Sequence, residues 1–167
     1  MASITQAWAV AVTLSTTNLQ NLQGTTSTIA WQSALVDLQT SVKPLDVEIG
    51  FKTSMANTAP ANDKAIYIYA CPAMYDGSAW FYTDQGTTIL PTGVESTSTI
   101  ALPNNLKLLG VLNYTTQKQD VNGTFNLSNA VGQSMPDGFS LVINNYTGSA
   151  LSVSTTVLYR TLTQTVA

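Results

Sequence analysis

Hydrophobic and polar residues alternate along much of this chain with a period of two. The clearest case is residues 45–53, where one face holds Leu45, Val47, Ile49 and Phe51 and the other holds Asp46, Glu48 and Lys52. A period of two places successive side chains on opposite sides of a β-strand. We therefore expect a strand with one face in the core and the other in water.

Further segments are rich in β-branched and aromatic residues and are separated by turn-forming clusters of Gly, Pro, Asn, Asp and Thr. They are Trp8–Leu14, Ile29–Leu38, Lys64–Ala70, Leu106–Asn113, Thr124–Leu127, Phe139–Asn144 and Val157–Leu162. None has a sustained helical period. The pattern predicts an all-β, single-domain fold, a jelly-roll-like antiparallel β-sandwich of roughly eight strands. An immunoglobulin-like sandwich remains open.

Three local features refine this prediction. Lys64–Ala70 is apolar on both faces, which indicates a central strand, and we expect Pro72 to end it by removing a ladder donor. Met74–Ser98 predicts a long connection with room for one short hairpin. Residues 1–24 are predicted to be an N-terminal arm or edge strand, and residues 25–167 the sandwich domain.

Charge is scarce in this sequence. Charged residues make up 9% of the chain, against roughly a quarter in typical soluble domains. The formal net charge is −3, and the Lys and Arg residues are scattered singly, so we expect no nucleic-acid binding. Met1–Val42 contains neither Lys nor Arg, which argues against a coat protein that packages nucleic acid through a basic arm. A neutral polar surface suits a subunit that sits among neighbours.

The chain contains no histidine, which removes every Ser-His or Cys-His nucleophilic arrangement and the commonest metal ligand. It also lacks a Ser-x-x-Lys motif and a phosphate-binding glycine loop. We expect no enzyme activity, no cofactor and no metal. The remaining catalytic hypothesis is a glycosidase-like pair, Asp46 and Glu48, on one strand face and about 7 Å apart. Alternating carboxylates on a polar strand face are more commonly just solvated.

Other signals are weaker. The turn carboxylates, including Asp76, Glu95 and Asp137, could ligate calcium but have no loop spacing that indicates it. Cys71, the single cysteine, follows an apolar strand and is predicted to be buried. The apolar run Ala7–Val12 is too short to span a bilayer, and no Lys or Arg precedes it to form the basic start of a signal peptide. We therefore expect no membrane association and no signal peptide.

Aromatic residues gather in the connection after the central strand. Aromatic residues in a loop can pack on the core, anchor a protein interface or stack on sugars. Together with two apolar residues near the N-terminus they form the predicted interface set: Ile4, Trp8, Tyr75, Trp80, Phe81 and Tyr82.

Three longer segments occur in an order and spacing that resemble a known family. They are Asp63–Ala70, Asn105–Val111 and Pro136–Leu151, and Trp31–Ala34 fits as well. Together they resemble small proteins of tailed bacteriophages that are associated with the head as decoration or cement proteins. The resemblance runs from about Leu19 to Leu151.

This resemblance implies a jelly-roll-like domain, a homotrimer, that sits on the major capsid protein and stabilises the shell. It implies a virion protein at the capsid surface, made in the host cytoplasm. The alternative function is a receptor- or carbohydrate-binding module of a phage tail or spike, which would use exposed aromatic side chains.

Overall fold

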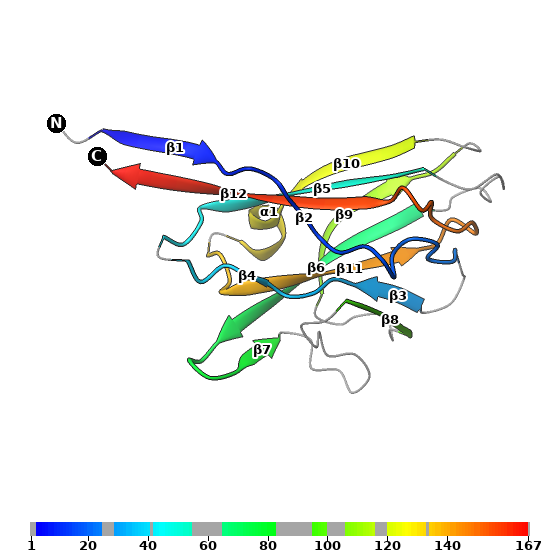
Figure 1. Ribbon diagram of the computed structural model, residues 1–167, viewed down its shortest axis with the longest axis horizontal. Coiled ribbons are helices and arrows are strands. Elements are labelled where there is room, and N and C mark those ends of the chain that lie inside the picture. The colour runs from blue at the N-terminus through cyan, green and yellow to red at the C-terminus, as the bar shows by residue number, and fades with distance from the viewer. Residues whose placement is uncertain are drawn as a thin grey trace.

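The computed structural model describes residues 3–24, 29–40, 42–54, 65–82, 95–99, 106–115, 120–132 and 134–166. Two antiparallel sheets face each other and form one sandwich (Figure 1). Sheet A runs in the order β1 (Ile4–Trp8), β12 (Thr156–Val166), β5 (Asp46–Ser54), β10 (Asp120–Asn126), and β2 (Val12–Thr13) also pairs with β12. Sheet B runs β7 (Trp80–Tyr82), β6 (Ala65–Tyr75), β11 (Gly138–Asn145), β3 (Ile29–Gln32), β8 (Ser96–Thr99), with β4 (Val36–Asp37) on β11 and β9 (Lys107–Asn113) on β6.

The core lies between the two sheets. Alternate residues of β5, namely Val47, Ile49 and Phe51, are buried against residues such as Ile68 of β6 and Leu141 of β11. The predicted all-β sandwich in a single domain is therefore confirmed, and so is the alternation along β5. Leu45 is the exception, because it precedes the strand and is largely exposed.

Two predicted strands are each interrupted. In place of one strand over residues 8–14, β1 and β2 both pair with β12, and β1 starts earlier, at Ile4. In place of one strand over residues 29–38, β3 and β4 both pair with β11. β12 and β11 are thus continuous strands, whereas the chain that pairs with each of them is divided into two shorter strands.

Pro72 does not end its strand, so that prediction was wrong. β6 continues through Pro72 to Tyr75, and Pro72 stands opposite Phe139 of β11. On the other side of β6, the β9 ladder stops at Ala70 and the β7 ladder starts at Ala73. Among the described residues, the strand has one neighbour at Pro72, and proline is tolerated where its missing donor faces the open side of a strand. The central position of β6 is confirmed, as is a short hairpin, which β6 forms with β7.

A short helix, α1 (Leu127–Val131), was missed by the sequence analysis. Residue 127 was assigned to a strand, but β10 ends at Asn126 and Leu127 is fully buried at the start of the helix. The Asp46 carboxylate accepts hydrogen bonds from the Ser128 backbone N–H (3.1 Å) and hydroxyl (2.9 Å). A side chain distant in sequence thus caps the helix, which a local reading could not find.

Residues 3–24 contain two different parts. All five residues of β1 are exposed, and the strand pairs with β12. Leu19 and Leu22, by contrast, are buried in the core between the sheets. The segment predicted as an arm or edge strand thus supplies an edge strand and then a core-packing turn.

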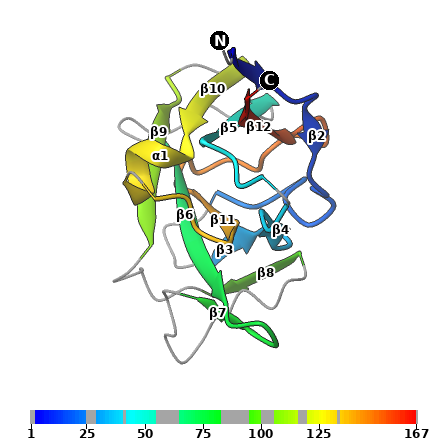
Figure 2. The same cartoon turned by 90° about the vertical axis from the view of Figure 1, so that its left-hand side faces the viewer.

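The strands β1 and β12 form a ribbon that projects from the sandwich (Figure 1). Viewed from that end, the N and C labels lie close together (Figure 2). The pairing of β12 with β5 ends at Leu162 opposite Asp46. From Leu162 to Val166, the partner of β12 is β1. We call these residues, Ile4–Trp8 and Leu162–Val166, the terminal ribbon.

This division predicts unequal effects on stability when Leu19 and Ile4, two side chains of the same size, are each truncated to alanine. Leu19→Ala should lower the free energy of unfolding by about 2–5 kcal/mol, because it opens a cavity in the core. Ile4→Ala should change it by no more than about 0.5 kcal/mol, because Ile4 packs at the surface. Urea denaturation of both variants checks this, and equal losses would contradict the division of the N-terminal segment.

Candidate functional site

The predicted interface residues fall into two separate groups. Ile4 and Trp8 lie on β1, in the terminal ribbon, whereas Tyr75, Trp80, Phe81 and Tyr82 belong to the β6–β7 hairpin. The two groups lie on different sheets, with β1 at one side of the sandwich and β7 at the other (Figure 1). The fold does not bring them together into one site.

Trp8 belongs to a three-residue stack on the outer face of sheet A. The guanidinium carbon of Arg160 lies 4.9 Å from the centroid of the Trp8 ring. Arg160 Nε donates to Glu48 Oε1 at 2.6 Å across the β12–β5 ladder. Partly exposed ion pairs contribute little to stability. The stack instead neutralises both charges and holds the indole against the sheet.

Apolar side chains surround this stack. Leu158 lies opposite Gly50 on the same outer face, and Leu162 lies opposite Trp8. At the end of the ribbon, Ile4 pairs with Val166, and both are about two-thirds exposed. We call this surface, made of Ile4, Trp8, Gly50, Leu158, Leu162 and Val166, the sheet A face. The sequence analysis identified Ile4 and Trp8 but missed Leu158, Leu162 and Val166 of β12. The signal that could have found them is the period of two along this strand, in which even-numbered residues lie on the face opposite to buried Val157.

The aromatic hairpin is only partly available for binding. The Tyr75 and Trp80 rings pack together with centroids 5.1 Å apart, and Trp80 covers Gly138, where a Cβ would lie 2.9 Å from the indole. Phe81 pairs with Met74 on the opposite face of the hairpin, and these side chains are 43% and 59% exposed. The hairpin thus offers one apolar pair and an aromatic pair that packs on sheet B.

A row of tyrosines that was not predicted lies on sheet B. The Tyr67 ring stacks beside Tyr69 at 6.4 Å and meets the edge of Tyr146 at 5.5 Å. Burial and the neighbouring Tyr146 and Tyr67 raise the pKa of Tyr69. All three rings remain partly exposed. Sequence reasoning treated Tyr67 and Tyr69 only as part of an apolar central strand.

The predicted carboxylate pair has structural partners. Asp46 accepts hydrogen bonds from Asn126 Nδ2 (2.7 Å) and from Ser128, and Glu48 pairs with Arg160. Both acids therefore serve the helix start and the sheet A face, and a glycosidase pair would need them to be directed at a substrate in a cleft.

The turn carboxylates also have local partners. Asp76 accepts from the backbone N–H groups of Ser78 and Ala79, both at 2.8 Å. Asp137 bonds Lys43 Nζ at 2.8 Å and the Tyr75 N–H at 3.0 Å, and these contacts, with the Lys43 hydrogen bond first, lower the pKa of Asp137. In the part of the chain that the structure describes, no cluster of three acidic, cysteine or histidine residues could hold a metal ion. Cys71 is buried, as predicted.

Glu95 is the carboxylate with the most long-range contacts. It accepts hydrogen bonds from the Ser15 hydroxyl, from the Asn18 N–H (2.7 Å) and from Trp31 Nε1 (2.8 Å), whose side chain is fully buried. Burial opposes the ionisation of Glu95, but these hydrogen bonds outweigh it and lower its pKa. The carboxylate ties the N-terminal turn to the start of β8 and to the core tryptophan.

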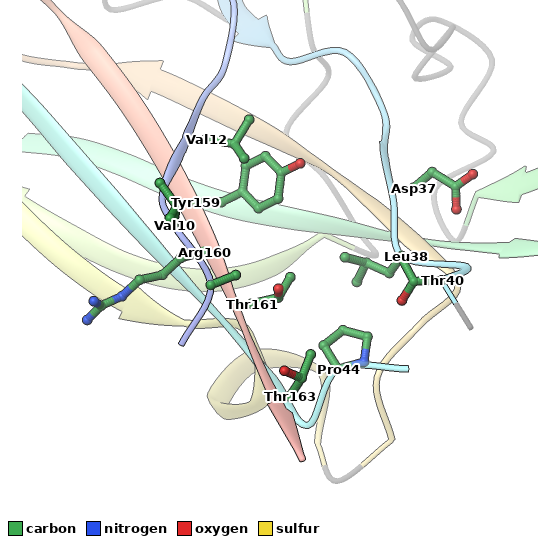
Figure 3. A pocket seen from close by; sticks show the side chains of 11 residues that line it. Val10, Val12, Asp37, Leu38, Thr40, Pro44, Tyr159, Arg160, Thr161 and Thr163 are labelled. Carbon is green, nitrogen blue, oxygen red and sulfur yellow. The ribbon is translucent and has the colours of Figure 1, made fainter. Parts of the chain in front are cut away.

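A hollow of about 180 Å³ lies where the link between β1 and β2 passes over β12 (Figure 3). Tyr159 and Val12 line one side, Leu38 and Pro44 line the other, and the Arg160 side chain extends away from it. Sites for small ligands are usually larger, about 300–1,000 Å³, and contain converging polar groups. This hollow has the size of a single side chain.

The lowered pKa of Glu95 predicts a loss of stability in acid. A carboxyl group whose pKa is lower in the folded state stabilises that state above its unfolded pKa, about 4.3 for glutamate, and this contribution disappears as pH falls through the folded pKa. Urea midpoints measured downward from about pH 5 should therefore fall more steeply for the unmodified protein than for Glu95→Gln. Asp76 and Asp137 are present in both proteins, so the difference reports Glu95 alone. Parallel curves would show that the Glu95 contacts contribute nothing.

Comparisons with protein-family models, with curated proteins and with solved structures found no match for this chain. Among the described residues, no helix is long and apolar enough to cross a membrane.

Proposed function

We propose that this protein is a non-catalytic structural protein of a virion, which binds the major capsid protein on the outside of a phage head and stabilises the shell. The observation that carries this proposal is the sheet A face together with the terminal ribbon. Both expose apolar side chains, and the ribbon contains no charged residue. The resemblance to phage decoration proteins supports the same function.

The strand order supports a jelly-roll connectivity, which we propose as the finer description of the fold. Eight strands remain if the short β2 and β4 are counted with β1 and β3, and the edge strands β7 and β8 are set aside. Numbered along the chain, they pair as 1-8-3-6 in sheet A and 2-7-4-5 in sheet B. Jelly rolls are double-sheet, eight-stranded folds that recur in viral capsid proteins and in lectins.

The chemistry of the terminal ribbon suits a shell contact. Its outward groups are threonine and glutamine side chains beside the apolar residues. Burying such neutral groups costs less desolvation than burying ions. Many copies on one shell add up many weak contacts. Each copy therefore needs a surface complementary to the capsid and no catalytic groups.

Binding to heads that lack a decoration protein tests this proposal. The unmodified protein should pellet with such heads in a saturable manner. Trp8→Ala should weaken the binding at least about tenfold, because aromatic hot-spot residues at an interface carry about 2 kcal/mol or more and about 1.4 kcal/mol already corresponds to tenfold.

Val153→Ser provides the matched control, because Val153 is exposed in the turn before β12 and lies outside the sheet A face. This variant should bind like the unmodified protein. The proposal fails if the unmodified protein does not bind heads. If Trp8→Ala and Val153→Ser both bind normally, the sheet A face is not the contact.

The tyrosine row favours a second candidate function, binding of a carbohydrate by a tail or spike module. Partly exposed tyrosine rings can stack on sugar rings, and jelly rolls include lectins. Tyr67 lies between its two neighbours, and Asn144 Nδ2 bonds the Tyr146 hydroxyl at 3.4 Å beside it. This arrangement supplies both aromatic surface and polar groups.

Retention on immobilised host-envelope polysaccharide distinguishes this candidate. A carbohydrate-binding module should be retained, and Tyr67→Ala should abolish the retention, whereas Phe81→Ala, which removes an exposed aromatic ring elsewhere, should not. Passage of the unmodified protein through the column without delay would exclude the polysaccharide used.

A further inference from the structure

The outer edge of β1 lacks the features with which other sheet edges prevent pairing. Sheet edges are normally protected by charged side chains, by proline, by bulges or by short strands. Among the described strands, β9 begins with Lys107, β10 begins with Asp120, β8 directly follows Glu95, and β7 has three residues. Residues 3–15, which include β1, contain no charge and no proline.

The backbone of β1 has hydrogen-bonding groups directed to its open side. The Ala9 N–H donates to the Thr161 carbonyl at 2.8 Å, so the backbone groups of Ala9 point toward β12. Ala7 and Thr5, at every second position before it, point the same way. In an antiparallel ladder this direction alternates from one residue to the next. Ile4, Gln6 and Trp8 therefore direct their N–H and C=O groups away from the sheet, and their side chains lie on the sheet A face.

The spacing of these three residues is self-complementary. If a second β1 pairs antiparallel about a two-fold axis at Gln6, the two Gln6 side chains face each other, and each Ile4 stands opposite a Trp8. Pairs of an aromatic and a β-branched residue stabilise antiparallel sheets, and facing amides can hydrogen-bond. The three residue pairs would exchange about six backbone hydrogen bonds.

The terminal ribbon also gains support from such pairing. An isolated two-stranded ribbon is marginally stable in water, and three or more strands are needed for independent stability. Among the described residues, β1 is the one pairing partner of β12 beyond Leu162. Pairing of two copies would convert both ribbons into the centre of one continuous sheet.

We propose that two copies of this chain associate through β1, with β1 of one copy antiparallel to β1 of the other and Gln6 on the two-fold axis. This arrangement is isologous, so one patch serves both copies. It replaces the homotrimer that the family resemblance implies as our proposal for self-association. It does not depend on the proposed function.

Light scattering of the purified full chain measures the assembly. We expect a mass of twice 17.8 kDa for the unmodified protein. Gln6→Pro should halve this mass, because it removes an outward N–H while leaving the bonds to β12 in place. Gln6→Ala keeps the N–H and should keep the dimer. Circular dichroism should show that both variants are folded.

Cysteine substitution tests the register independently. Gln6→Cys should form a covalent dimer on mild oxidation. The Cα atoms of directly opposite, hydrogen-bonded residues lie about 5.5 Å apart, which is within the Cα–Cα range of a disulfide. Ala7→Cys should not, because Ala7 would face Thr5 of the other copy. The buried Cys71 is common to both variants.

A monomer or a trimer in solution would overturn the inference, as would a folded Gln6→Pro variant that remains dimeric or equal crosslinking of the two cysteine variants. A monomer that pellets with phage heads would overturn the pairing of β1 and leave the proposed function standing. A dimer that does not bind heads would support the pairing of β1 and overturn the proposed function.

Discussion

The structure depends on burying the facing sides of two sheets against each other. Val47, Ile49 and Phe51 of β5 pack across the sandwich on β6 and β11, and the fully buried Trp31 of β3 joins them. Each such side chain contributes about 1.5–3 kcal/mol when it leaves water. One cysteine allows no intrachain disulfide, and the two ion pairs among the described residues are partly exposed. The core must therefore supply most of the stability.

Because the core supplies most of the stability, the surface of the sandwich needs few ion pairs and can be poor in charge. Several of the described charged residues have specific structural partners: Asp46 at the start of α1, Arg160 with Glu48 beside Trp8, and Glu95 on the Trp31 indole. Neutralising these groups leaves broad surfaces of Thr, Gln and apolar residues. Such surfaces bind other proteins at a low desolvation cost, and they lack the charge that would prevent unintended association.

The features predicted correctly are those that depend on local period. Alternation identified β5, and the apolar run at residues 64–70 identified the central strand β6. Sequence reasoning failed where distant contacts decide. Pro72 is tolerated because β6 has one neighbour there among the described strands, and α1 is capped by Asp46, more than 80 residues away. Glu95 was assigned to a turn, because its partners Ser15, Asn18 and Trp31 come from far earlier in the chain.

The candidate surfaces follow the same rule. Ile4 and Trp8 could be singled out as apolar residues near the N-terminus, but their association with Leu158, Leu162 and Val166 required the register of β12. The tyrosine row likewise depends on Tyr146, which lies beyond β11 and reaches back to Tyr67. Pairing between strands distant in sequence thus defines each surface.

Our central proposal is that this sandwich, in which charged residues are scarce, attaches to a phage head through sheet A. Cryo-electron microscopy of phage heads incubated with the protein tests it most directly. If sheet A is the contact, the heads should show additional density at regular positions on their outer surface, with the sheet A face and the terminal ribbon against the capsid. Heads without added density, or density in which sheet A faces away from the shell, would contradict it.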